Sequence, residues 1–344
     1  MQQEAGNDST NIQIAGNVNV GISVDQARQI ALDVFKANFY EFSEKAAKKA
    51  LERAEEITED FVNKFFTETP HLISKLEEPA VQSSMFNAQK EYAKTGDKEL
   101  EERLLELLVA RIDSEERSLK QIVLDEAILI IPKLTNDQLD ILTLIFSIVA
   151  LNNSDITNIP SLIQFLNIRI LNFYPIDPPS YSFFTHLQFC GCCIVIAEGA
   201  SYMPLDDICR TQFKGLFAKG FSEEEFRKEV DEDISKYRSL FIKSLRNPVA
   251  LQFNALTDKD FDERINPAFI DFVGKLKSFW EKNTMSAVEV KQYLIDFNPR
   301  FENLIKDWKE SELKTIKLTS VGNIIAALNY NKKTGRKIDF NQLI

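Results

Sequence analysis

The sequence has few of the residues on which most catalytic and metal sites depend. It holds two His, four Cys and 11 Gly among 344 residues. It contains no H-E-x-x-H, G-x-S-x-G or G-x-x-x-x-G-K-[ST] motif. With only His71 and His186 available, a Ser-His-Asp or Cys-His site has few candidates. We therefore expect no catalytic residue, cofactor or metal, and a function that rests on binding.

Long apolar runs and an excess of positive charge are also missing. The most apolar segments, residues 139–151 and 183–197, fall short of the roughly 20 residues that a membrane-spanning helix needs. They indicate buried core helices, which would meet a membrane only after a conformational change. The polar, acidic start has no signal-peptide pattern, so we expect a cytoplasmic protein. A net charge of -11 disfavours a protein that coats nucleic acid.

The N-terminal segment differs from the rest of the chain because its apolar residues alternate with polar ones. Period-two alternation predicts a half-buried strand, and Ala15-Gly16-Asn17 suits a tight turn within a hairpin. Two strands alone are marginal in water, so this segment needs a partner. We expect it to pair between copies of the chain through Ile12, Gln13, Ile14, Val18 and Val20.

Strands of this kind can also pair edge to edge without limit and form a fibril. Ile12-Gln13-Ile14 with Gly16 is similar to the I-Q-[IV]-G core of amyloid signalling motifs, in which β-branched and amide side chains stack between chains. A closed set of strands is favoured here, because a permanently exposed edge would aggregate.

Helical periodicity begins after Ser23, which forms a capping box with Gln26. Residues 24–69 contain no Pro or Gly; an unbroken helix there would span about 65 Å, and the aromatic residues 39–42 offer a break. The alternative is a kinked hairpin. Periodicity predicts a mainly α body, divided as an assembly segment (1–22), a long-helix domain (23–134), a buried helical domain (135–220) and a C-terminal domain (221–344).

The C-terminal residues predict a small α+β module. A strand at 313–318, a helix at 321–330 and a closing strand after Gly335 give a winged-helix-like order. Residues 314–337 carry six basic residues and no acidic one: Lys314, Lys317, Lys332, Lys333, Arg336 and Lys337. They predict either a local nucleic-acid contact or docking against the acidic helix at 223–233.

A group of possible metal ligands stands at Cys190-Gly191-Cys192-Cys193, with His186 one helical turn earlier. Structural zinc uses two ligand pairs about a dozen or more residues apart, and only Cys209 lies downstream. Free Cys is among the most buried residue types. Buried thiols are the favoured interpretation, ahead of a metal site or a redox-active thiol.

Several runs resemble an uncharacterised bacterial family. They are the leader S-T-N-I-Q-x-x-G at residues 9–16, A-R-Q-I-A-L-D-V-F-K at 27–36, R-A-E-E-I-T at 53–58, Q-K-E-Y-A at 89–93 and L-T-S-V-G at 318–322. Similar leaders occur in bacterial immunity proteins, so the resemblance implies a role in antiphage defence. It implies no activity or site residue.

Together these features favour a non-enzymatic, homo-oligomeric antiphage-defence protein, a sensor or a toxic effector of the abortive-infection type. Its partners would be other copies of itself and a phage or host protein as trigger. The alternatives are a nucleic-acid-binding regulator, a membrane-active effector and a metal-dependent nuclease. The nuclease would use E-x-K triplets such as those that begin at Glu289 and Glu312.

Overall fold

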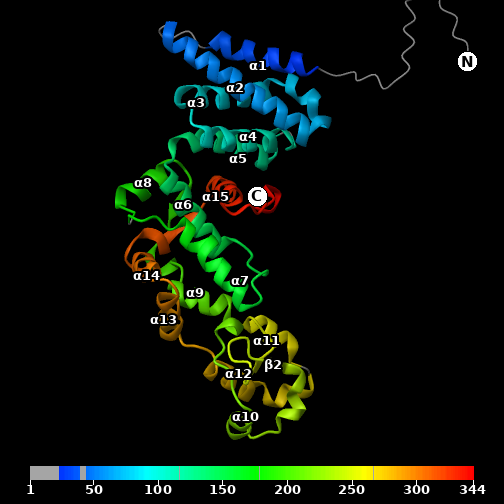
Figure 1. The fold of residues 1–344 in the computed structure, drawn as a ribbon, viewed down its shortest axis with the longest axis vertical. Helices are drawn as coiled ribbons and strands as arrows, with labels where there is room; N and C mark the ends of the chain where they lie inside the picture. The colour runs from blue at the N-terminus through cyan, green and yellow to red at the C-terminus, as the bar shows by residue number, and fades with distance from the viewer. Residues whose placement is uncertain (1–22, 39–43, 116, 178, 266) are drawn as a thin grey trace, which may run out of the picture. The chain divides into compact units, whose positions relative to one another are not determined.

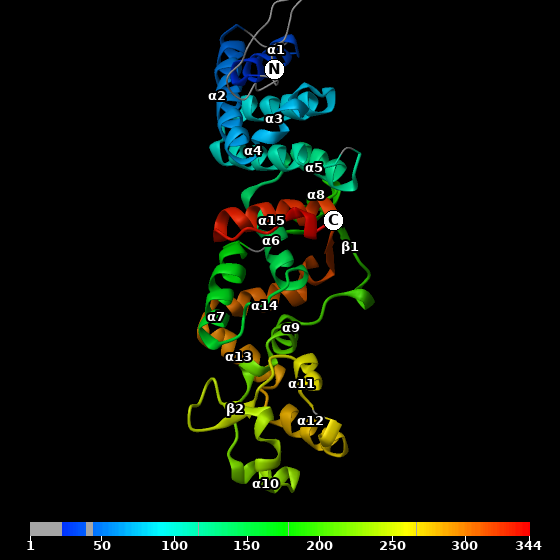
Figure 2. The ribbon, with the colours of Figure 1, turned by 90° about the vertical axis from the view of Figure 1, so that its right-hand side faces the viewer.

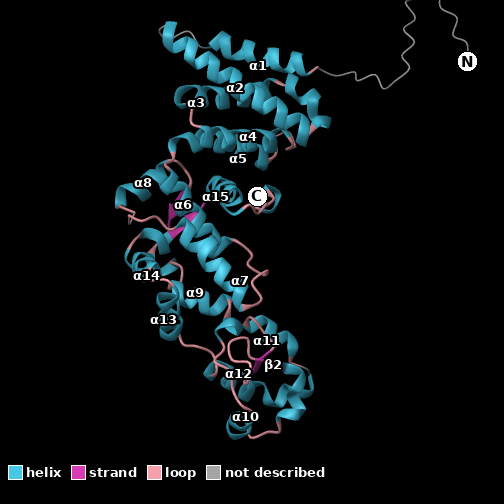
Figure 3. Cartoon of the chain, viewed as in Figure 1, coloured by secondary structure: helices cyan, strands magenta, loops and turns pink. Residues whose placement is uncertain are grey.

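The computed structural model of the chain describes residues 23–38, 44–115, 117–177, 179–265 and 267–344. The protein is mainly helical, as predicted (Figure 1), and its strands are short segments between helices (Figure 3). The chain divides into two compact units, residues 1–129 and 130–344. The finer division into four segments stays a prediction. Within the described residues, no helix has the length and apolar character needed to cross a bilayer.

The first unit is a set of packed helices. Its described helices are α1 (Val24–Asn38), α2 (Glu44–Glu68), α3 (Pro79–Thr95), α4 (Lys98–Ile112) and α5 (Leu119–Ile130). Helix α2 packs against α1, α3 and α4. Its apolar face buries Ala54, Phe61 and Phe65, which is the face that the spacing of three and four residues predicts.

The sequence left open whether residues 24–69 form one unbroken helix or a kinked hairpin. Arg28 Nη2 of α1 lies 2.7 Å from Glu59 Oε1 of α2, whereas about 45 Å would separate these positions along one straight helix. The two helices therefore form a hairpin, which was the alternative interpretation. Helix α2, with 25 residues, is the long N-terminal helix.

The second unit contains the remaining α-helices and the strands. They are α6 (Asn136–Ile145), α7 (Ile159–Gln164), α8 (Tyr181–Phe189), β1 (Cys193–Val195), α9 (Leu205–Gln212), α10 (Glu223–Val230), β2 (Phe241–Lys243), β3 (Leu251–Phe253), α11 (Asp258–Arg264), α12 (Val273–Lys282), α13 (Ala287–Phe297), α14 (Arg300–Glu310), β4 (Ile316–Leu318) and α15 (Ser320–Thr334). Helix α6 lies against α15 (Figure 2). The buried side chains of α6 confirm the predicted core helix there.

The second predicted buried helix, at residues 183–198, is only partly formed. Helix α8 ends at Phe189, and the chain then turns at Gly191, whose φ of 71° suits glycine. The β-branched residues that follow form β1 instead of more helix. Strand β1 pairs antiparallel with β4, which places Ile194 opposite Lys317.

The winged-helix-like order fails at its last element. Strand β4 and helix α15 form as predicted, but residues 335–339 form no strand. The Asn331 side chain accepts a hydrogen bond from the Ile338 N–H at 2.8 Å and donates one to the Ile338 carbonyl at 3.3 Å. These bonds take up the main-chain groups of Ile338 that a strand would use. Strand β4 pairs instead with β1, from far earlier in the chain.

A second set of strands and helices surrounds an aromatic core between α9 and α13. Strand β2 pairs antiparallel with β3, and α10, α11 and α12 cover them. The buried aromatic side chains of this core are Phe221, Phe226, Tyr237, Phe241, Phe253, Phe261, Phe279 and Trp280. Aromatic rings bury large areas and pack edge to face, so this segment has a hydrophobic core of its own.

Candidate functional site

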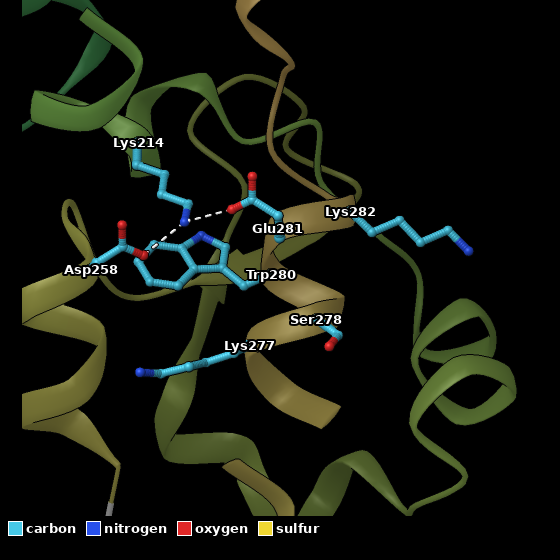
Figure 4. Close-up of a pocket in the computed structure, with 7 residues that line it drawn as sticks. All are labelled: Lys214, Asp258, Lys277, Ser278, Trp280, Glu281 and Lys282. Carbon is cyan, nitrogen blue, oxygen red and sulfur yellow. Dashed lines mark hydrogen bonds and ion pairs between the residues drawn. The ribbon is translucent and has the colours of Figure 1, made fainter. Parts of the chain in front are cut away.

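A surface pocket of about 730 Å³ lies beside Lys214, in the turn after α9 (Figure 4). Lys214 is itself buried, and its Nζ lies 2.7 Å from Asp258 Oδ1 and 2.8 Å from Glu281 Oε2. The same nitrogen lies 4.6 Å from the centre of the Trp280 ring. Asp258 begins α11, while Glu281 and Trp280 belong to α12. The lysine thus joins the end of α9 to both helices.

The other charges at this pocket are also used within the chain. Arg210 of α9 forms an ion pair with Glu281, and its Nε donates a hydrogen bond to the Met285 carbonyl at 2.9 Å. The two lysines on the rim have carboxylate partners at 2.6 Å, in the pairs Lys277–Asp262 and Lys282–Glu229. The arrangement neutralises charge and holds elements together.

Trp280 offers no free face to a ligand. Its side chain is 2% exposed, and its ring stacks on Phe261 with centroids 4.3 Å apart. The pocket is therefore best explained as a structural tether. Sequence reasoning missed it, although one signal was present: Lys214 is a lone charge in the apolar run Phe213-Lys214-Gly215-Leu216-Phe217, where a buried charge needs partners.

The six basic residues of the C-terminal stretch do not form one cluster. Lys314 and Lys317 lie before and within β4, whereas Lys332, Lys333, Arg336 and Lys337 lie at or beyond the last turn of α15. Helix α15, with 15 residues, separates the two groups by roughly 20 Å. Lys333 pairs with Asp140 at 2.6 Å and Arg336 with Asp155 at 2.7 Å; Lys314 and Lys332 also take part in interactions. Much of this charge is therefore compensated.

Asp155 contacts two guanidinium groups, those of Arg336 in this stretch and of Arg169. Its Oδ1 lies 3.0 Å from Nη1 of the buried Arg169, and its Oδ2 accepts from Arg336. The Arg169 hydrogen bond, with help from Arg336, lowers the pKa of Asp155 to about 2. The carboxylate thus fastens the C-terminal segment to the buried arginine.

We expect Asp155→Asn to destabilise the protein in a pH-dependent way. A depressed carboxyl pKa adds stability above the unfolded-state value near 4, and this stability is lost as the pH falls toward 2. Because the Asp155 side chain is 42% exposed and solvent screens its ion pairs, urea unfolding should show a loss of about 1 kcal/mol at pH 7 and a smaller loss at pH 3. Asp177→Asn, at an exposed site, is the control. An equal loss at both pH values would contradict the assignment.

The four thiols are free and buried, as predicted. Burial raises the pKa of Cys190, raises that of Cys192 and Cys209 to about 12, and raises that of Cys193 to about 11. A thiol is nucleophilic as its thiolate, so these environments hold the cysteines in the unreactive form. Within the described ranges, no group of three or more His, Cys, Asp or Glu side chains is placed to hold a metal ion.

His186 lies between Cys190 and Gln138. Its Nε2 is 3.7 Å from Cys190 Sγ, and its Nδ1 lies 3.0 Å from Gln138 Nε2 and 3.2 Å from Gln138 Oε1. Gln138 also caps α6, because its Oε1 accepts from the Thr135 N–H. The histidine therefore links α8 to the start of α6.

Unit 1 contains a charged cluster at the start of α4. Lys98 Nζ lies 2.7 Å from Glu56 Oε1 and 2.6 Å from Oε2 of the buried Glu101. Tyr92 donates to Glu56 at 2.6 Å. The hydrogen bond from Lys98, followed by that from Tyr92, lowers the pKa of Glu56. The lysine holds α2 and α4 together, so this cluster is also explained by packing.

The surface around β1 brings exposed apolar side chains together on adjacent elements. Phe189, the last residue of α8, is 86% exposed, and Ile194 and Val195 of β1 are 48% and 41% exposed. We call these three residues the β1 edge patch. They lie on adjacent elements, since α8 packs against β1. Exposed apolar groups that share one region often mark interaction sites. The predicted assembly residues Ile12, Gln13, Ile14, Val18 and Val20 lie outside the described residues.

The fold and these sites define a mainly helical protein whose described charged clusters serve packing and whose exposed apolar residues include those of the β1 edge patch. The model of one protein family, described as ":-like", matches residues 21–344. The chain therefore belongs to this family, and the description names no activity. No curated protein and no solved structure matches the chain.

Proposed function

We propose that the chain is a non-enzymatic, homo-oligomeric protein of bacterial antiphage defence, a sensor or toxic effector of the abortive-infection type that acts in the cytoplasm. The observation that carries the assembly part is the β1 edge patch, where Phe189, Ile194 and Val195 stay exposed. Association would remove this surface from water, which is favourable in proportion to the apolar area buried. The defence role rests on the leader at residues 9–16.

The nucleic-acid alternative has less support. Lys333 and Arg336 are paired with Asp140 and Asp155, and a phosphate would have to replace these carboxylates. The six basic residues also form two separate groups, so they present no single stripe along which a backbone could lie. The membrane-active alternative would need a rearrangement of buried helices such as α6, whose side chains lie inside the second unit.

Deleting residues 1–22 should abolish self-assembly, because the residues that the sequence predicts to pair between copies lie there. Light scattering on the full chain should give a multiple of 39.4 kDa, and the deleted chain should give the mass of a single copy. Deleting only residues 1–8, which precede the alternating segment, is the matched control and should leave the oligomer intact. An unchanged mass after the longer deletion would reject the proposal.

The defence role has a separate measurement. Bacteria that express the full chain should lower the plating efficiency of a susceptible phage in a panel, and bacteria that express the chain without residues 1–22 should not. Equal protection by both chains would show that defence does not need residues 1–22. No protection against any phage in the panel would argue against the defence role.

A further inference from the structure

Strand β1 has one edge that β4 does not use. The Ile196 N–H donates to the Thr315 carbonyl at 2.8 Å, and the Thr319 N–H donates to the Cys192 carbonyl at 3.1 Å. With Ile194 opposite Lys317, these bonds show that the main-chain groups of residues 192, 194 and 196 face β4. In an antiparallel pair, alternate residues bond to opposite sides. The N–H and C=O of Cys193 and Val195 therefore face away from β4.

The free edge is accessible at Val195. Cys193 is 1% exposed, but Val195 is 41% exposed and its neighbour Ile194 is 48% exposed. Successive side chains of a strand point to opposite faces, so Ile194 lies on an open face, whereas the face that Val195 shares with the buried Cys193 and Ile316 is open only at Val195 itself. Among the described residues, β1 has no strand neighbour other than β4. An edge with exposed apolar side chains is a template for another strand.

The N-terminal segment has the chemistry that fits this edge. Residues 9–24 contain no charged residue, between Asp8 and Asp25, and their apolar residues alternate with Asn, Gln and Gly. An uncharged, β-branched segment can bury its side chains against Ile194 and Val195 without leaving a charge unpaired. Residues 9–22 would extend to about 45 Å as a strand, far longer than β1, so pairing needs only part of the segment.

We propose that residues 9–22 of a second copy add to the free edge of β1 as a strand. This inference rests on the proposed self-assembly and names its acceptor. Each copy then carries one donor strand and one acceptor edge, which are different surfaces. Contacts of this head-to-tail type close into a ring or continue as a filament, depending on the rotation between neighbours.

Two substitutions at Val195 test the acceptor. Val195→Pro removes the N–H that faces the free edge and leaves the bonds of residues 194 and 196 to β4 in place. Val195→Lys puts a charge at the edge and covers the case in which the proline variant does not fold, which thermal unfolding would show. Both should reduce the oligomer to single copies in light scattering. Val288→Lys, at a 76% exposed apolar site on α13, should leave the oligomer intact.

Cross-linking identifies the donor residues and tests whether donor and acceptor belong to different copies of the chain. One tagged chain carries Ile12→Cys, Ile14→Cys, Val18→Cys or Val20→Cys, and a differently tagged chain carries Val195→Cys; the native thiols are buried. After mixing and oxidation, at least one donor position should give a disulfide-linked species with both tags. Val288→Cys in place of Val195→Cys should give none.

The outcomes distinguish this inference from the proposed function. If deletion of residues 1–22 abolishes assembly but both Val195 variants still assemble and no cross-link forms, β1 is rejected as acceptor while self-assembly stands. As a further control, one chain can carry both cysteines. If a disulfide forms within that chain but never between the two tagged chains, the second copy is rejected as donor. If the deleted chain still assembles, the proposed function and this inference both fail.

Discussion

Phe221→Ala should cost about 3–5 kcal/mol of the free energy of unfolding. Phe221 is 2% exposed, and its ring centre lies 4.8–6.2 Å from those of Phe226, Phe241, Phe253 and Phe279. Its main chain also exchanges two hydrogen bonds with Leu251, at 2.9 and 2.8 Å. Removing the ring would leave a cavity among four aromatic side chains and lose its contacts with all of them.

Urea unfolding gives the size of this effect, and hydrogen exchange gives its location. Amides of α10, β2, β3 and α12 should lose protection, whereas those of α2 and α3 in the other unit should not. Val249→Ala, at a 94% exposed site in the same segment, should change stability by no more than about 0.5 kcal/mol. A loss below about 1 kcal/mol for Phe221→Ala would show that this core is loosely packed.

Gly322→Ala should destabilise the second unit by about 3 kcal/mol, because a methyl group has no room there. A Cβ at this position would lie 1.9 Å from the Cys192 carbonyl oxygen. That carbonyl accepts the hydrogen bond of Thr319 and precedes β1. The added methyl would therefore push the first turn of α15 away from the main chain beside β1, and the β1–β4 pair would move with it.

Gly274→Ala is the matched control for this substitution. Gly274 also lies in the first turn of a helix, α12, but a Cβ there has no atom within 4 Å. Alanine is the better helix former, so this change should be neutral or stabilise by up to about 1 kcal/mol. Calorimetry on both variants would measure the contrast. Equal melting temperatures would contradict the close approach of Gly322 to Cys192.

Local signals identify where several helices begin. Two capping boxes can be read from the sequence and are formed: Ser23 with Gln26, and Thr135 with Gln138. Both depend on residues three apart, so no tertiary contact is needed to identify them. The amphipathic spacing likewise identified α2, because one buried face imposes the period.

Contacts between distant residues explain what the sequence did not predict. Strand β4 pairs with β1, more than a hundred residues earlier, and no local pattern identifies that partner. The absent closing strand depends on the Asn331 side chain, which satisfies the main chain of Ile338. The tether at Lys214 requires Asp258 and Glu281, which are found only once the fold brings α9, α11 and α12 together.

The segment between α9 and α13 has its two ends side by side. The Met285 N–H donates to the Phe217 carbonyl at 2.9 Å, and the Lys219 N–H donates to the Asn283 carbonyl at 2.8 Å. Helices α9 and α13 pack directly against each other. Adjacent ends and a separate core are the features of a segment that can be inserted into a fold without moving its host. In evolutionary terms, such a segment can be enlarged or exchanged while the surrounding helices keep their path.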